Sequence, residues 1–114
     1  MEVAKLRERG ELVEQFTDWC KDAGITDAAV VSIVGAVRTA TLATMKADDP
    51  KTTVYSEHKL AEVSGVGEVE DGVPNLHVTL GLEGGATFSG HLHAATIGGP
   101  YFVNVYLEPI AADA

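Results

Sequence analysis

The amino-acid sequence predicts an α+β fold, with one main amphipathic helix packed on a largely antiparallel β-sheet. Apolar residues recur at helical spacing in a single segment, residues 11–23. Most of the remaining chain consists of β-type segments separated by turns rich in Gly, Pro and Asp. The length of 114 residues corresponds to one domain. We place this domain at 1–114, with its core at about 6–107 and a frayed tail at 111–114.

The helix is expected over residues 11–23, where one apolar stripe is evident. The stripe is formed by Leu12, Phe16, Trp19, Cys20 and Ala23. Gly24 follows at the position where a glycine commonly ends a helix. Cys20 is the single cysteine, so an internal disulfide is impossible. Its place on the stripe predicts a buried side chain rather than a nucleophile.

The strands are expected between clear turn signals. Asp, Gly and Pro mark turns at 48–50, 71–72 and 98–100. The β-type segments are residues 28–34, 36–44, 52–59, 60–69, 76–82, 86–97 and 102–107. Gly35 interrupts the first run and indicates a bulge or a bend. The residues ahead of the helix are interpreted as a solvated lead-in.

The charge distribution argues against nucleic acid as a ligand. Acidic residues number 17 and basic ones 8, which gives a formal net charge of −9. From Leu60 onward the chain carries only acids, which repel phosphate backbones. Lys5, Arg7 and Arg9 form a small basic cluster that could still contact DNA, although a solvated segment is the simpler interpretation.

The hydropathy of the chain favours a cytoplasmic protein. No apolar run approaches the ~20 residues that a membrane helix needs. The first five residues lack the basic-then-apolar layout of a signal peptide. We therefore expect no membrane contact.

A hairpin over residues 75–94 carries the most informative pattern. Alternation with a period of two gives each strand one apolar face and one face with polar or histidine side chains. The two apolar faces must be buried on the same side, which pairs Leu80 with Phe88 and Leu76 with Leu92. The connection is then the three-residue loop 83–85, a common hairpin length.

This register places His77 opposite His91, and Asn75 opposite His93. Directly opposed Cβ atoms lie roughly 4.5–5.5 Å apart, so three of the four histidines converge on one face. Three neutral imidazoles plus water are a known zinc arrangement. The alternative is three exposed histidines on the wet face of a sheet. The fourth histidine, His58, is interpreted as a surface residue.

Three motifs of the sequence occur together in one known family. The first is Arg9-Gly10-Glu11-Leu12 with the helix after it and the apolar run into 33–37; the second is 62–67. The third combines the strand 76–80 with Phe88-Ser89-Gly90-His91-Leu92 across a short acidic turn. Together, over about Leu6 to Leu107, they resemble the PPC domain, the plants and prokaryotes conserved domain.

The resemblance implies an α+β homotrimer. Plant members of the family carry an added AT-hook that binds the minor groove of AT-rich DNA, and they use the PPC part for assembly and partner contacts. Prokaryotic members are usually a lone domain and are described as candidate DNA-binding proteins. The fold is also similar to that of acetolactate decarboxylase, a zinc enzyme whose metal is held by histidines of this kind.

The sequence departs from the family pattern at the histidines. The family commonly has a histidine where Asn75 stands, whereas His77 and His91 match it. His93 replaces an apolar residue and could restore a third ligand from across the ladder. The resulting candidate set is His77, His91 and His93, adjacent to Asn75, for one zinc or other divalent transition metal per chain. Glu62 is the carboxylate considered as a general base or as a partner of a ligand.

Two functions are therefore considered. The first is a non-enzymatic assembly or interaction module, a homotrimer of the class linked to DNA binding and regulation. Tyr101, Phe102 and Tyr106 then lie in the subunit interface or, equally, in ordinary core and edge packing. The second is a zinc-binding protein that uses the histidine cluster. Enzymatic activity is less favoured, because kinship of fold does not transfer chemistry. No Arg-Gly-Arg-Pro core of an AT-hook occurs in the sequence, so minor-groove binding does not carry over.

Overall fold

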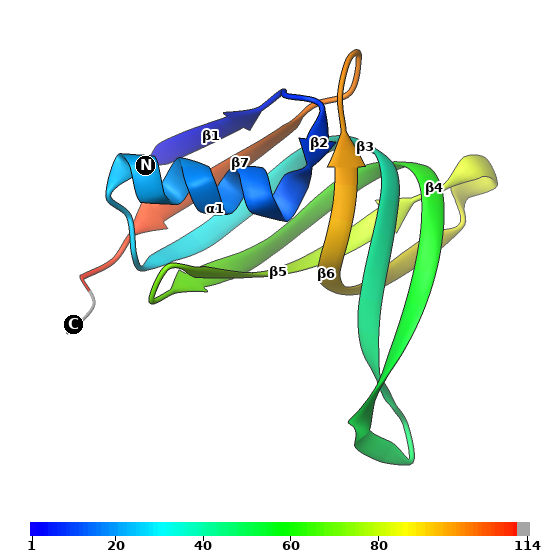
Figure 1. Ribbon diagram of the computed structural model, residues 1–114. Helices are drawn as coiled ribbons and strands as arrows, with labels where there is room; N and C mark the ends of the chain where they lie inside the picture. The colour runs from blue at the N-terminus through cyan, green and yellow to red at the C-terminus, as the bar shows by residue number, and fades with distance from the viewer. Residues whose placement is uncertain (112–114) are drawn as a thin grey trace.

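The computed structural model describes residues 1–111 and shows one helix packed on a curved sheet (Figure 1). The elements are β1 (Glu2–Leu6), β2 (Gly10–Glu11), α1 (Leu12–Ala23), β3 (Ala28–Lys46), β4 (Asp49–Glu70), β5 (Val73–Gly81), the short 3-10 turn η1 (Glu83–Gly85), β6 (Thr87–Ile97) and β7 (Val103–Pro109). All strand pairs are antiparallel, in the order β1-β7-β3-β4-β5-β6-β2. The predicted fold, one helix on an antiparallel sheet, is confirmed. The expected fraying of the tail falls mostly on residues 112–114, which lie outside the described residues.

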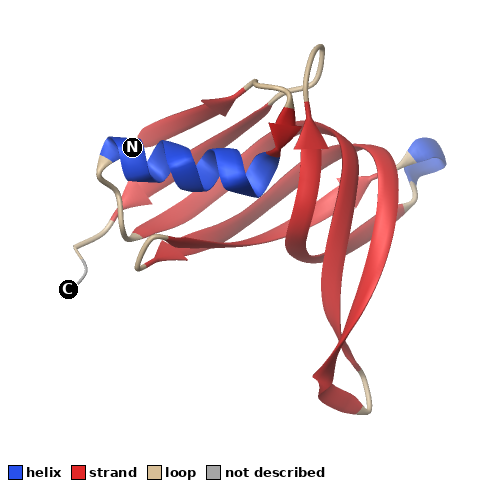
Figure 2. Cartoon of the chain, in the orientation of Figure 1, coloured by secondary structure: helices blue, strands red, loops and turns tan. Residues whose placement is uncertain are grey.

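Strand β3 pairs along both of its edges and organises the sheet. One edge pairs with β4 over nearly its whole length. On the other edge, residues 28–35 pair with β7 and residues 39–43 pair with β6. Because β4 pairs with β5 and β5 pairs with β6, the strands β3 to β6 close into a ring. Beyond the ring, β3 and β4 project as a hairpin, residues 44–54, which we call the arm (Figure 2).

Two long strands replace the four shorter ones predicted over residues 28–69. Strand β3 has 19 residues and continues through Gly35. A Cβ atom at Gly35 would lie 2.1 Å from the carbonyl oxygen of Phe102, so the glycine allows two backbones to touch. The amide of Ala36 donates to that same oxygen at 3.0 Å. Gly35 therefore marks a close approach inside a strand and does not end it.

Helix α1 begins one residue later than expected and ends as expected. The carboxylate of Glu11, at the N-cap, accepts hydrogen bonds from the amides of Val13 at 2.9 Å and Glu14 at 2.8 Å. Gly24 adopts the left-handed conformation, with φ 71°, and its amide donates to the Lys21 carbonyl. The buried side chains of the helix are Leu12, Phe16 and Cys20. Burial raises the pKa of the Cys20 thiol to about 11, which confirms the expected core position.

The interpretation of the N-terminal segment as a lead-in is wrong, because this segment forms strand β1. Ala4 and Leu6 are buried, and the strand pairs with β7. In the sequence, Ala4 and Leu6 alternate with Lys5 and Arg7, and this alternation could have predicted the strand. The side chains of Lys5, Arg7 and Arg9 are exposed, as expected. Within residues 1–111, no helix is both long and apolar enough to cross a membrane.

Candidate metal centre

The β5–β6 hairpin positions the histidines, and its predicted register is confirmed around the turn. Leu80 pairs with Phe88. The amide of Leu82 donates to the Ala86 carbonyl at 2.8 Å and closes the predicted three-residue loop. Two glycines in this loop have positive φ, 76° and 85°, which explains why a glycine pair stands there. The apolar residues of β5 are buried toward the helix, so the alternate side chains point to the opposite face of the sheet, which we call the outer face.

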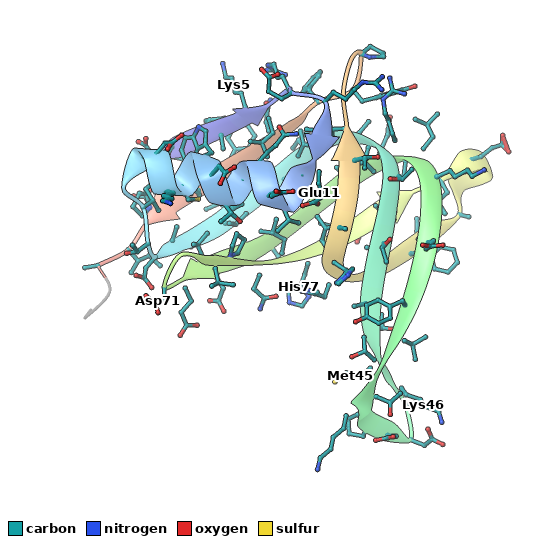
Figure 3. The ribbon with its side chains drawn as sticks, in the orientation of Figure 1. Lys5, Glu11, Met45, Lys46, Asp71 and His77 are labelled. Carbon is teal, nitrogen blue, oxygen red and sulfur yellow. The ribbon has the colours of Figure 1, made fainter. Side chains whose placement is uncertain are left out.

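His77, His91 and Asn75 meet on the outer face. His77 pairs with His91 across the ladder, and the ring centroids are 5.9 Å apart. The Nδ1 atom of His91 lies 2.9 Å from Oδ1 of Asn75. An amide oxygen can only accept, so Nδ1 of His91 carries the proton and Nε2 keeps its lone pair for a ligand. Figure 3 shows His77 projecting from β5 on the side away from α1.

The environment keeps His91 neutral. Its ring is half-buried, and this burial lowers its pKa below the ordinary value of 6.5. The charges of His77 and His93 lower the pKa further. A neutral imidazole is the form that binds a metal ion. His91 therefore has the protonation state that a transition metal needs at neutral pH.

His93 lies apart from this pair. Past His91, strand β6 pairs with β3, and the register skips one residue, because Thr41 pairs with Ala94 while Leu42 pairs with Leu92. The ring of His93 packs edge-on against Tyr55 of β4, with centroids 5.1 Å apart. No set of three His, Cys, Asp or Glu side chains within residues 1–111 is arranged to hold a metal ion.

The observed register also changes the partner expected for Asn75. This residue pairs with Glu68 on β4 and bonds to His91, whereas a pair with His93 is not formed. Glu68 is thus the carboxylate next to the site, and the pairing of β4 with β5 was the signal that could have found it. Glu62, the acid considered from the sequence, lies opposite Gly81, four residues before Val66, the partner of His77 on β4.

Glu62 belongs to a separate hollow on the outer face. This hollow has a volume of about 590 Å³ and lies between β3, β4, β5 and the loop before β7. Glu62, Ser64 and Thr79 supply its polar groups, and Tyr101 and Phe102 supply its aromatic wall. The hollow and the histidine pair are therefore neighbouring features of one face and not one site.

His58, interpreted from the sequence as a surface residue, packs against another aromatic side chain. Its side chain is half-buried, and its ring lies 4.5 Å from the Phe88 ring, centroid to centroid. Its Nε2 atom also lies 2.9 Å from the hydroxyl of Ser56. The closure of the ring of strands folds the base of the arm toward β6, and sequence spacing alone does not show this closure.

The fold and the face just described define a class, a small antiparallel α+β protein with a histidine pair on its outer sheet face. Within that class the chain belongs to the Plants and Prokaryotes Conserved domain family, abbreviated PPC or PCC, whose family model matches residues 2–108. The resemblance inferred from the motifs is thereby confirmed.

Solved structures of similar fold come from archaea and bacteria. A metal-containing protein of Archaeoglobus fulgidus has 27% identity and a TM-score of 0.82, over 96% of this chain and 79% of that one. A plant- and prokaryote-conserved protein of Pyrococcus horikoshii has 25% identity and a TM-score of 0.80, over 96% and 78%. A candidate DNA-binding protein of Ralstonia eutropha JMP134 has 18% identity and a TM-score of 0.79, over 95% and 76%.

The expected likeness to acetolactate decarboxylase is confirmed at the level of fold. A Staphylococcus aureus protein of unknown function, similar to alpha-acetolactate decarboxylase, has a TM-score of 0.68 at 12% identity, over 96% of this chain and 52% of that chain. Such low identity shows the fold alone. No curated protein matches the sequence.

Proposed function

We propose that this chain is a homotrimeric PPC module that acts through assembly and partner contacts. One observation carries the proposal: helix α1 covers one face of the sheet, and the outer face exposes apolar side chains. Val34 is 51% exposed and Val66 is 55% exposed on neighbouring strands. Phe102, at the edge of the same face, is 42% exposed. Contiguous exposed apolar surface commonly marks an interface.

The family supports the trimer, and the arm supports an extended contact. The PPC resemblance implies three subunits. The arm exposes Met45 and Val54, and Tyr55 at its base is exposed as well. Burying such side chains against another subunit is favourable by roughly 25 cal/mol per Å² of apolar surface. Of the three aromatic residues considered for the interface, Phe102 is exposed, whereas Tyr101 and Tyr106 are half-buried.

A charge placed on the outer face tests this assembly. Val66→Glu puts a carboxylate among the exposed apolar residues, and we expect it to dissociate the trimer. Ala23→Glu is the control, because it adds the same charge at an exposed position of helix α1, on the other side of the sheet. Native mass spectrometry reports the subunit number of both variants. A Val66→Glu protein that stays trimeric would show that the outer face is not the interface.

A second function is supported by the histidine pair, namely binding of zinc or another divalent transition metal. His77 and His91 would supply two imidazole nitrogens, and Asn75 orients the second. His93 could join them if its ring left Tyr55, and water could fill the remaining positions. A homologue with 27% identity is described as metal-containing, which favours this proposal. Zinc held there would act as a Lewis acid or activate water.

Elemental analysis tests this second function. The chain is purified without an affinity tag or chelator, beside the triple variant His77→Ala/His91→Ala/His93→Ala. We expect about one transition-metal ion per chain, lost in the triple variant. His58→Ala is the matched control, since His58 lies on another part of β4 and should leave the metal content unchanged. A metal-free protein that takes up no added zinc would exclude the site.

DNA binding by this chain is not part of the proposal. Its net charge is −9, and assembly would multiply that charge. A gel-shift assay with AT-rich DNA at low salt checks this point. Direct phosphate contact would appear as an affinity that falls steeply with salt.

A further inference from the structure

The loop between β6 and β7, residues 98–102, is held by an arginine. Arg38 of β3 donates from Nε to the carbonyl of Gly98 at 3.1 Å and from Nη2 to the carbonyl of Gly99 at 2.7 Å. Its guanidinium carbon also lies 5.4 Å from the centroid of the Tyr101 ring. The head group of Arg38 is therefore fixed in orientation, and its remaining N–H groups are still available.

Two further arginines contact the same loop from the segment between β1 and β2. The guanidinium carbon of Arg7 lies 4.5 Å from the centroid of the Phe102 ring. Arg9 packs its Cα and Cβ against Gly98, where an added Cβ atom would lie only 3.1 Å from either of them. Three arginines that are distant in the sequence thus surround five residues. Lys5, labelled on the same upper edge of the molecule in Figure 3, pairs with Asn104 of β7.

None of these arginines is neutralised by a carboxylate within residues 1–111. The one ion pair made there by a lysine or arginine side chain joins Lys46 to Asp48 at the tip of the arm. The nearby carboxylate of Glu11 is bonded to backbone amides of the helix and to that of Ala95 on β6. Glu8 lies between Arg7 and Arg9 but forms no ion pair with either. Within the described residues, the three arginines around the 98–102 loop therefore have no carboxylate partner, although the chain as a whole is acidic.

The chemistry of the cluster suits an oxyanion. A guanidinium stacked on an aromatic ring keeps its in-plane N–H groups free, and these groups match the oxygen spacing of phosphate and carboxylate. Arg7 uses one such group only in a long contact, 3.5 Å, to Oδ1 of Asn104. Of the eight basic residues, the other four are spread over the rest of a chain with 17 acidic residues, so an extended polyanion would meet net repulsion beyond this loop.

We propose that Arg7, Arg9 and Arg38 around the 98–102 loop form a binding site for a compact oxyanion, the phosphate or carboxylate group of a small ligand. All of its residues belong to one chain and none is a histidine of the pair, although Phe102, which holds Arg7, lies at the edge of the surface proposed for assembly.

Calorimetric titration of the full chain with pyrophosphate, and separately with citrate, tests the proposal at low salt. We expect saturable binding of at least one anion. The anion that binds with the higher affinity shows whether the site prefers a phosphate or a carboxylate group. Arg7→Gln/Arg9→Gln should weaken binding by about tenfold or more. Lys51→Gln/Lys59→Gln removes the same charge elsewhere and should change the affinity by less than about twofold.

Two more variants keep the test decisive if Arg7→Gln/Arg9→Gln fails to fold. Arg7→Lys/Arg9→Lys retains the charge but loses the planar fork, and it should still bind measurably more weakly than the native chain. Glu8→Gln removes the intervening acid and should tighten binding. The proposal is overturned if neither anion binds, if the two double Gln variants weaken binding equally, or if only a short DNA duplex binds at this loop.

Discussion

His91 donates a hydrogen bond from Nδ1 to the side-chain oxygen of Asn75 at 2.9 Å, and this bond fixes the orientation of the imidazole ring. The two residues come from neighbouring strands and are diagonal to each other, because the residue directly opposite His91 is His77. In the proposed metal centre, this bond makes Asn75 a residue that orients His91.

Loss of the Asn75 amide should weaken metal binding by the proposed centre. Asn75→Ala frees the His91 ring to rotate, and partners of this kind are typically worth about 10–100-fold in metal affinity. Thr79→Ala is the control on the same strand and face, because Thr79 bonds to Ser89 and to neither histidine. Competition with a zinc chelator measures both. Equal affinities for Asn75→Ala and native protein would contradict this role.

The metal-free protein should lose stability on acidification because of His91. Burial first, and then the charges of His77 and His93, lower its pKa below 6.5 in the folded chain. Below pH 6.5 the unfolded chain therefore binds more protons than the folded chain, so stability falls as pH drops from 6.5 through the lowered value. An NMR titration should place the His91 midpoint below 6.5, and His77→Ala should move it upward without restoring it fully. A midpoint at or above 6.5 in the native chain would refute the assignment.

Gly35 should tolerate no side chain. A Cβ atom there would lie 2.1 Å from the Phe102 carbonyl oxygen and 2.8 Å from the Val103 Cα atom. We expect Gly35→Ala to destabilise the fold by about 1–3 kcal/mol, the usual cost of overpacking. Gly81→Ala is the control, since its Cβ atom would meet nothing closer than 3.9 Å. Urea unfolding compares the two, and equal midpoints would show that the close approach relaxes easily.

The carboxylate of Glu11 should contribute more to stability than that of Glu14, its neighbour in the first turn. It accepts from the amides of Val13 and Glu14 and also from the amide of Ala95 at 3.0 Å, which ties the helix to β6. Glu11→Ala leaves these donors without a partner, at a cost of about 1–3 kcal/mol. Glu14→Ala should cost only a few tenths, roughly the worth of one exposed charge near a helix end. Thermal unfolding that ranks the two variants in the opposite order would contradict this account.

Cys20 should be unreactive in the folded chain. Its thiol is buried, with a pKa of about 11, so little thiolate exists at neutral pH. A thiol-modifying reagent at mildly alkaline pH should label the native chain slowly and the urea-unfolded chain rapidly. Rapid labelling of the native chain would mean that the helix opens readily from the sheet.

The helix, the antiparallel pattern and the hairpin register were accessible from the sequence because each depends on local periodicity. The stop at Gly24 and the pairs Leu80–Phe88 and His77–His91 follow from side-chain spacing and turn length. Such features need no knowledge of which distant strands meet.

The remaining features depend on contacts between distant segments. The sequence indicates a bulge or a bend at Gly35 and not a close approach, because its partner, the Phe102 carbonyl, is 67 residues away in the sequence. At His93 the pairing of β6 with β3 skips one residue, and this irregularity accompanies the separation of His93 from the histidine pair. The contact of His58 with Phe88 depends on the closure of strands β3 to β6 into a ring. The ligand set His77, His91 and His93 remains a prediction.

The mass of the native chain in solution tests the central claim, assembly through the outer face, most directly. Sedimentation equilibrium at micromolar concentration should give a mass near three times the 12.0 kDa of one chain, and Val66→Glu should lower it to that of one chain. A native protein that sediments as a monomer would contradict the account, because the apolar side chains of the outer face would then be stable in water without a partner.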